Sequence, residues 1–193
     1  ENNAWLLNIR GNDSKYTPIP NCYVLIDKKK NIKFFCDLKK VSNLFKKNFK
    51  KIEFVHINYT SEILSKIHKK KVVIDKNTCS IYYENIILKN NKILVHQDPI
   101  YNLKAIKQKK EIENIKEAHI YDGAALTKYL FWLKSNFLKN KITEISAEKK
   151  LFNFRKKNKN FNFLSFPTIS GTGPNGAIIH YKATKNSNRR LKK

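Results

Sequence analysis

The sequence contains no methionine, only three cysteines, and no apolar run long enough to cross a membrane. Even the initiator methionine is missing, so we expect the chain to be a piece of a longer polypeptide or the product of a damaged reading frame. Nothing at its start resembles a signal peptide. The number of cysteines is odd, and their spacing is not that of metal ligands (Cys22, Cys36 and Cys79). This pattern favours buried thiols in a reducing cytoplasm over a disulfide framework.

Acidic residues are also scarce: 15 Asp and Glu oppose 40 Lys and Arg, for a net charge of +25. Such a charge raises the question of nucleic-acid binding. The cations are nearly all Lys and are scattered, and the joint abundance of Lys, Asn, Ile, Phe and Tyr is typical of coding DNA biased toward A and T. Arginine, which suits bidentate recognition of bases and phosphates, occurs only at Arg10, Arg155, Arg189 and Arg190. We predict no specific nucleic-acid partner; the alternative, a basic nucleic-acid binder, would require steeply salt-dependent binding.

Residues 1–98 alternate short apolar runs with amphipathic segments, which predicts a layered α/β domain with one sheet buried under helices. The expected strands are 4–9, 22–26, 32–36, 52–57, 72–74 and 93–95, and the expected helices are 37–48, 60–68 and 77–88. A turn, Arg10–Asp13, follows the first strand. Its simplest interpretation is structural: Gly11 supplies a backbone angle while Arg10 and Asp13 make local polar contacts.

Asp98 and Pro99 mark the expected domain boundary, because proline disfavours helix at the residue before it. A continuous helix is expected from about Leu103 to Asn136, passing through Gly123 at a propensity cost of about 1 kcal/mol. Its apolar stripe comprises Ile112, Ile115, His119, Asp122, Leu126, Tyr129 and Leu133. A second helix is expected from Thr143, whose hydroxyl can cap it, to about Lys157, with Glu144 in the favourable first turn.

The most informative stretch is 163–181, with the sequence FLSFPTISGTGPNGAIIHY. Residues 164–170 and 177–181 are expected to be strands around a glycine-rich turn, forming a hairpin that presents His180 at a strand end. Taken alone, such an imidazole is most simply satisfied by a structural hydrogen bond. The turn lacks the Lys-Ser/Thr pair and the following helix of a phosphate-binding loop.

This stretch closely resembles the segment that opens the active site of the aminopeptidase P family, the Xaa-Pro aminopeptidases of the creatinase/prolidase "pita-bread" group. The resemblance continues in order along nearly the whole chain, through Trp5–Asp13, Lys104-Ala105, Glu111, Ala118-His119, Asp122, Ala125-Leu126, Trp132-Leu133, Thr143–Ala147 and Phe154-Arg155. It implies an α/β fold: a creatinase/prolidase N-terminal-like α/β domain over residues 1–98, then the truncated N-terminal part of a pita-bread α+β peptidase domain over residues 99–193.

The resemblance implies an enzyme that removes the N-terminal residue from peptides with proline second, using a hydroxide activated by two divalent metal ions, typically Mn²⁺. It assigns His180 to substrate binding and oxyanion stabilisation, because a positioned N–H donor stabilises the charge that develops on the attacked carbonyl oxygen. The family's metal ligands (two Asp, one His and two Glu) lie C-terminal to the His180 segment. We therefore place no metal ligand in this chain and expect the fragment alone to bind no metal and to be inactive.

The other histidines, His56, His68, His96 and His119, show no HExxH or Cys/His spacing. His119 lies in the helical stripe and is expected to be a core or interface residue. The resemblance further implies peptides with N-terminal Xaa-Pro as partners, a homodimer at full length, a cytoplasmic location and no membrane partner. Without the rest of the catalytic part, apolar surface over 104–181 should be exposed and solubility poor. The alternative function is a catalytically dead pita-bread binding module or the product of a decayed gene.

Overall fold

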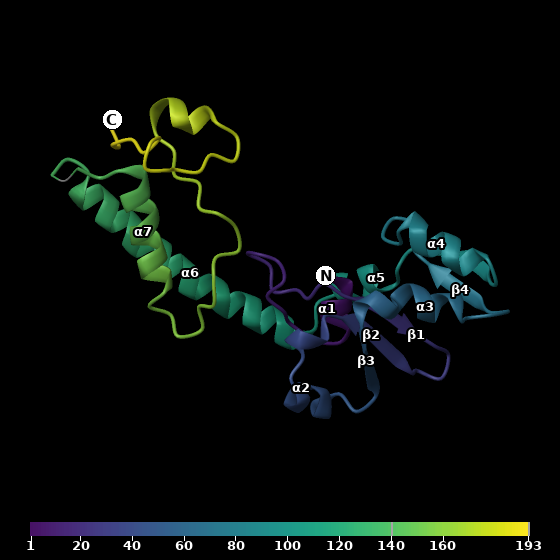
Figure 1. The fold of residues 1–193 in the computed structure, drawn as a ribbon. Coiled ribbons are helices and arrows are strands. Elements are labelled where there is room, and N and C mark those ends of the chain that lie inside the picture. Colours follow the sequence, from purple (N-terminus) through teal and green to yellow (C-terminus); the bar gives the residue numbers. More distant parts are fainter. Residues whose placement is uncertain (140, 193) are drawn as a thin grey trace. The chain divides into compact units, whose positions relative to one another are not determined.

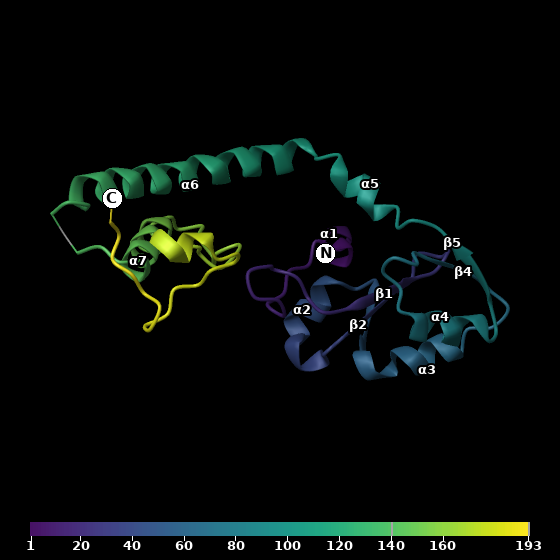
Figure 2. The ribbon, with the colours of Figure 1, turned by 90° about the horizontal axis from the view of Figure 1, so that it is seen from above.

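The computed structural model describes residues 1–139 and 141–192. Contacts divide the chain into two compact units, an N-terminal unit, Glu1–Ile106, and a C-terminal unit, Lys107–Lys193. Both are drawn in Figure 1 and, from above, in Figure 2. Each unit has its own secondary structure, so we describe them in turn.

Two small sheets form the centre of the N-terminal unit. Strand β1 (Tyr23–Ile26) pairs antiparallel with β2 (Ile32–Cys36), and β2 pairs parallel with β3 (Ile52–His56). The second sheet consists of the parallel strands β4 (Lys71–Ile74) and β5 (Lys92–Val95). The expectation of a single sheet is therefore wrong. Leu25 of β1 packs against the buried cluster that contains Ile74 of β4, so the two sheets are joined by side-chain packing and not by strand pairing.

Short helices supply the layers against these sheets, which confirms the layered α/β expectation (Figure 1). Their bounds are η1 (Leu38–Lys40), α2 (Asn43–Asn48), η2 (Ile57–Tyr59), α3 (Thr60–Ser65), α4 (Ile81–Leu88) and α5 (Ile100–Ala105). One core cluster places Phe34 of β2 with Phe45 of α2. The other joins Leu64 of α3, Ile74 of β4 and Ile87 of α4. Because strand side chains alternate between faces, one sheet can bury apolar residues on both sides.

The helix expected over 37–48 is two helices, because the segment contains two capping residues. The Asp37 carboxylate accepts a hydrogen bond from the Lys39 N–H (3.0 Å) and caps η1. The Ser42 hydroxyl accepts one from the Phe45 N–H (3.1 Å) and caps α2. Each cap satisfies a backbone donor that a helix start leaves unpaired, so the chain begins a new helix at each.

The strand expected over 4–9 is wrong, since residues 4–6 belong to helix α1 (Asn2–Leu6). Asn8 follows with a φ of 50°. The Ile9 N–H donates to the Ala4 carbonyl (3.0 Å) and the Asn8 N–H to the Trp5 carbonyl (3.1 Å), which together make a Schellman motif. Asparagine tolerates the left-handed conformation that this motif needs. Ala4 and Ile9, which this motif links, are both buried.

The C-terminal unit is built on helices α6 (Lys109–Asn136) and α7 (Glu144–Arg155), which lie side by side in Figures 1 and 2. The Arg155 guanidinium of α7 binds Asp122 of α6 with two hydrogen bonds (Nε to Oδ1, 2.6 Å; Nη2 to Oδ2, 3.0 Å). Helix α6 continues through Gly123, and the Thr143 hydroxyl caps α7 by accepting from the Ser146 N–H (3.3 Å), so both of these expectations are confirmed.

The long helix does not begin at Leu103 as expected. Helix α5 ends at Ala105, Ile106 has extended backbone, and α6 starts at Lys109. The cause is a capping box: the Gln108 N–H donates to the Glu111 carboxylate (2.8 Å), and the Gln108 side chain accepts from the backbone N–H of Glu111. This pair satisfies the donors of a new helix start and so favours a break just before it.

The hairpin expected over 164–181 is also wrong. Among the described residues neither expected strand is present, and the only regular element there is the 3₁₀ helix η3 (Gly173–Ala177). Pro167 and Pro174 remove backbone donors that a strand ladder needs, and Pro174 opens η3. Gly171 allows a close approach: a Cβ atom there would lie 2.9 Å from the Asn175 carbonyl oxygen. The segment therefore coils back on itself instead of pairing.

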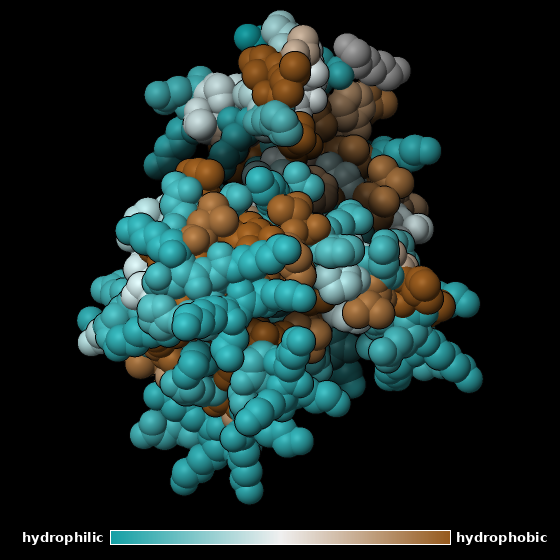
Figure 3. All heavy atoms as spheres, turned by 90° about the vertical axis from the view of Figure 1, so that its right-hand side faces the viewer, coloured by the Kyte–Doolittle hydropathy of each residue, from teal (hydrophilic) through white to brown (hydrophobic). Residues whose placement is uncertain are grey.

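Apolar side chains are exposed over the C-terminal unit, as expected for 104–181. They include Ile112, Ile115, Ile120, Leu126, Phe131, Phe166, Ile169 and Ile179. His119 is exposed too, so of the two expectations, core or interface, the core one is wrong. Its Nδ1 lies 2.8 Å from the Ile115 carbonyl oxygen of the same helix. Figure 3 faces the side of Figure 1 on which the N-terminal unit is drawn, and this face is mainly hydrophilic, with apolar patches among the polar side chains.

We predict that Gly123→Ala raises the free energy of unfolding of the C-terminal unit by about 1 kcal/mol, because a Cβ atom at this helix-interior position meets nothing within 4 Å. Urea unfolding in a Trp5→Phe background would leave Trp132 as the fluorescent reporter of this unit. Gly171→Ala is the matched control and should destabilise the same unit, since its Cβ would collide with backbone. A loss of stability in Gly123→Ala would contradict the prediction.

Candidate functional site

The candidate site is the loop 171–181, which η3 and the turn after it form. His180 lies in that turn with an exposed side chain and a φ of 54°. The Tyr181 N–H donates to the Ile178 carbonyl (3.2 Å), and the Ile178 N–H donates to the Asn175 carbonyl (3.3 Å). Two tight turns therefore precede Tyr181, and they place the imidazole of His180 at the surface of the loop.

A buried carboxylate lies under this loop. Glu144, the first residue of α7, has no exposed surface, and its two oxygens accept hydrogen bonds from four residues. Oε1 accepts from the Thr172 N–H (2.8 Å) and Asn175 Nδ2 (3.0 Å). Oε2 accepts from the Tyr181 hydroxyl (2.8 Å) and the Arg189 N–H (3.0 Å). The carboxylate thus connects the start of α7 to two separate stretches of irregular chain.

The two side-chain donors of this cluster are themselves buried and connected. Asn175 and Tyr181 are 7% and 6% exposed, and Asn175 Nδ2 lies 2.8 Å from the Tyr181 hydroxyl. Both side chains also reach the Ser187 carbonyl oxygen, at 2.9 Å and 3.1 Å. A fully satisfied buried polar network of this kind holds one geometry, because any misplaced member leaves a buried polar group without a partner.

Burial raises the pKa of the Glu144 carboxyl, but hydrogen bonds from the Thr172 and Arg189 N–H groups and from Tyr181 and Asn175 outweigh it. The net pKa of Glu144 is therefore below its ordinary value, and the carboxylate is charged at neutral pH. Burial also raises the pKa of the Tyr181 hydroxyl, which keeps it a donor. A charged acceptor surrounded by donors is the strong form of a hydrogen-bond cluster.

Sequence analysis identified His180 but not the cluster beneath it. Glu144 was noted only for its helix position, and Tyr181 only as a strand end. Asn175 was noted only as one residue of the turn. A signal was present, since an acid follows a good N-cap and an Asn lies inside a Gly-Pro-Asn-Gly turn. Their meeting depends on how 171–190 folds back onto α7, which no local pattern encodes.

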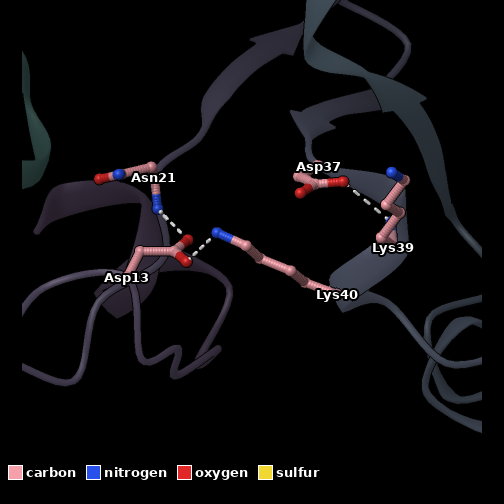
Figure 4. Close-up of polar contacts among 5 residues, drawn as sticks. All are labelled: Asp13, Asn21, Asp37, Lys39 and Lys40. Carbon is pink, nitrogen blue, oxygen red and sulfur yellow. Dashed lines mark hydrogen bonds and ion pairs between the residues drawn. The ribbon is translucent and has the colours of Figure 1, made fainter.

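The Arg10–Asp13 turn is satisfied locally (Figure 4). One Asp13 carboxylate oxygen accepts from the Asn21 N–H (2.8 Å) and the other pairs with the Lys40 ammonium. The bond from Lys40, followed by that from Asn21, lowers the pKa of Asp13. Arg10 donates to the Ala4 and Ile9 carbonyls (3.1 Å each). These contacts match the structural interpretation of the turn.

The expected reason for Gly11 is wrong. Its φ is not positive, and what excludes a side chain is the backbone of Pro20, 2.9 Å from where a Cβ atom would lie. Gly11 therefore permits a close approach of two chain segments, instead of supplying a special backbone angle.

Within residues 1–139 and 141–192, no three His, Cys, Asp or Glu side chains lie close enough together to hold a metal ion. The residues of this part of the chain thus do not fit a metal centre. None of the described helices is long and apolar enough to span a membrane.

Two family models match the chain in order: the Creatinase/Prolidase N-terminal domain over residues 1–111 and Metallopeptidase family M24 over residues 113–193. The architecture agrees with this class, an α/β N-terminal domain followed by the start of a pita-bread peptidase domain. The chain belongs to the creatinase/prolidase group of M24 metallopeptidases.

Individual relatives agree. The chain is 38% identical over 198 residues to a probable Xaa-Pro aminopeptidase P of Laccaria bicolor, covering 98% of this chain and 30% of that protein. It is 36% identical to the Paracoccidioides lutzii counterpart, covering 95% and 32%. The chain therefore spans about a third of the length of these curated relatives.

Solved structures show the same fold. The X-prolyl aminopeptidase of Caenorhabditis elegans, described as a cytosolic enzyme with a di-nuclear active site, matches with a TM-score of 0.85 and 27% identity. That match covers 98% of this chain and 32% of the other. The Xaa-Pro dipeptidase of Bacillus anthracis, at 20% identity and a TM-score of 0.54, covers 81% and 42% and is similar in fold alone.

We predict that Glu144→Gln lowers the free energy of unfolding of the C-terminal unit by about 3 kcal/mol at neutral pH, since it removes a charged acceptor from four donors and leaves an amide NH₂ facing them. The folded-state pKa of Glu144 is depressed, so its contribution is fully present above the unfolded pKa of about 4.3 and is lost as pH falls through the folded pKa. The stability difference between the two proteins should therefore shrink only in acid.

Urea midpoints from pH 7 to acid, in the Trp5→Phe background, test this prediction. Glu148→Gln removes the same charge from the same helix outside the cluster and should change stability by less than about 0.5 kcal/mol. A difference between the parent and Glu144→Gln that is independent of pH into strong acid would show that the charge of Glu144 contributes nothing.

Proposed function

We propose that the polypeptide carrying this chain is an Xaa-Pro aminopeptidase, which removes the N-terminal residue from peptides with proline second. The single observation that carries the proposal is the match of both family models, in order, along nearly the whole chain. The relatives of similar sequence bear that activity in their names, and so does the solved structure with a TM-score of 0.85.

His180 is the residue of this chain that we assign to the substrate. Its imidazole is exposed at the end of a tight turn. An N–H donor held there would stabilise negative charge on the carbonyl oxygen of the peptide bond before proline. Gly173 and Gly176 in the same loop leave the backbone open to a peptide.

The complete enzyme would bind two divalent ions, by analogy with the di-nuclear site of the C. elegans neighbour. We propose that these ions are Mn²⁺. The ligands would come from chain beyond residue 193, because the described residues offer no suitable group. We assign residues 1–98 to the creatinase-like domain and 99–193 to the start of the peptidase domain. We further propose a cytoplasmic homodimer, in keeping with the cytosolic neighbour for its location.

In the polypeptide that includes the remaining peptidase domain, we predict that His180→Ala lowers kcat for an Xaa-Pro peptide by about 10²- to 10³-fold, the usual loss for one oxyanion donor. The rate of hydrolysis would be measured as the release of the N-terminal amino acid in the presence of Mn²⁺. His68→Ala, an exposed histidine in the N-terminal unit, is the matched control and should leave kcat unchanged.

The two possible failures have different meanings. Unchanged kcat in His180→Ala would remove His180 from the mechanism while leaving the enzyme class intact. Saturable binding of Xaa-Pro peptides without release of an amino acid would indicate the catalytically dead binding module instead.

Residues 1–193 alone are predicted to release no amino acid from an Xaa-Pro peptide with Mn²⁺ present, because the ligands would be missing. The chain should also precipitate more readily than the longer polypeptide, since the apolar side chains of the C-terminal unit are exposed. Robust hydrolysis by the 193-residue chain would overturn the placement of the metal ligands.

A further inference from the structure

We propose that Glu144 is a positioning residue. Its buried carboxylate holds the loop that carries His180 at two points, Asn175 and Tyr181, which lie on either side of His180 in sequence. This inference deepens the proposed function and rests on the role assigned to His180. It concerns a residue that lies far from His180 in sequence and is covered by the very loop it would hold.

Asn175 and Tyr181, the residues on either side of the exposed stretch 176–180, both bind the Glu144 side chain. Asn175 Nδ2 donates to Glu144 Oε1 (3.0 Å) and lies 3.1 Å from Oε2. Six residues later, the Tyr181 hydroxyl donates to Oε2 (2.8 Å). Between these two points, residues 176–180 are all exposed, and Ile179 is 86% exposed. The part of the loop that carries His180 is thus free in the middle and attached at Asn175 and Tyr181.

The attachment should restrict where the imidazole points. His180 immediately precedes Tyr181, and its φ of 54° lies in the left-handed region that non-glycine residues rarely adopt. Surrounding contacts must hold such a conformation, because it is less stable than the alternatives by itself. The Tyr181 hydroxyl bond to Glu144 and the Tyr181 N–H bond to the Ile178 carbonyl (3.2 Å) are the contacts closest in sequence.

The chemistry of the cluster requires a carboxylate. Four residues donate to it, and an ionised carboxylate is an acceptor at both oxygens, whereas a glutamine would turn an NH₂ toward donors. Without Glu144, Asn175 and Tyr181 would keep each other and the carbonyl and hydroxyl of Ser187 as partners. The loop would then be attached to another irregular segment instead of to helix α7.

A double-mutant cycle on kcat separates positioning from plain stability. The variants are Glu144→Gln, His180→Ala and the double variant, in the polypeptide with the complete peptidase domain and with an Xaa-Pro peptide and Mn²⁺. Glu144→Gln should lower kcat by about tenfold to a hundredfold, as expected when a catalytic group is displaced by about an ångström. In the His180→Ala background the same change should alter kcat less than about twofold, because residues that act as a unit are non-additive.

Equal losses of kcat from Glu144→Gln with and without His180 would overturn the proposal. Glu148→Gln on the same helix is the matched control and should leave kcat unchanged. If Glu144→Gln fails to fold, Tyr181→Phe removes one donor from Oε2 and keeps the aromatic ring, and it should show a smaller loss with the same non-additivity.

Amide hydrogen-exchange rates of residues 1–193 distinguish a failure of this inference from a failure of the proposed function. Glu144→Gln, but not Glu148→Gln, should speed exchange of the amides of Thr172, Ile178 and Tyr181. Faster exchange with unchanged kcat in His180→Ala would keep the attachment and refute the role of His180. Unchanged exchange would refute the attachment whatever the kinetics show.

Discussion

The loop 171–181 of the C-terminal unit depends on one buried charge, the carboxylate of Glu144. A carboxylate taken out of water is costly unless donors replace the water it loses. Glu144 is supplied with donors from Thr172, Asn175, Tyr181 and Arg189, so the cost is offset only when two irregular stretches are in place together. This requirement explains how a loop with no strand pairing and little apolar contact has a defined conformation.

The N-terminal unit is held in a different way. Its order comes from two apolar clusters on either side of small sheets, and the polar contacts of the Arg10–Asp13 turn only fasten the adjoining loop. A long surface helix with exposed apolar residues would gain little from such packing. The C-terminal unit therefore relies on the α6–α7 contact, the Asp122–Arg155 pair and the Glu144 cluster.

The two kinds of order bear on the role that we propose for His180. That role requires a loop that is exposed and still placed accurately, and apolar burial cannot do both at His180. Attachment to a charged side chain beneath the loop can, since it leaves the middle of the loop open. In this respect the exposed imidazole and the fully buried carboxylate are parts of one arrangement.

The sequence by itself determined the family, most helices and strands, and the residue to test. The spacing of apolar residues predicted α6, α7 and five of the strands, and residue type predicted the Thr143 cap. These features follow from local spacing and local hydrogen bonding. The 4–9 run is helical in part because Asn8 closes a Schellman motif, a local arrangement that the apolar pattern does not indicate. Over 164–181 the prolines oppose strand pairing, and the hydrogen bonds from Asn175 and Tyr181 to Glu144 decide where the coiled segment lies. Only the tertiary structure could show this, since a donor and its acceptor more than thirty residues apart leave no periodic trace in the chain.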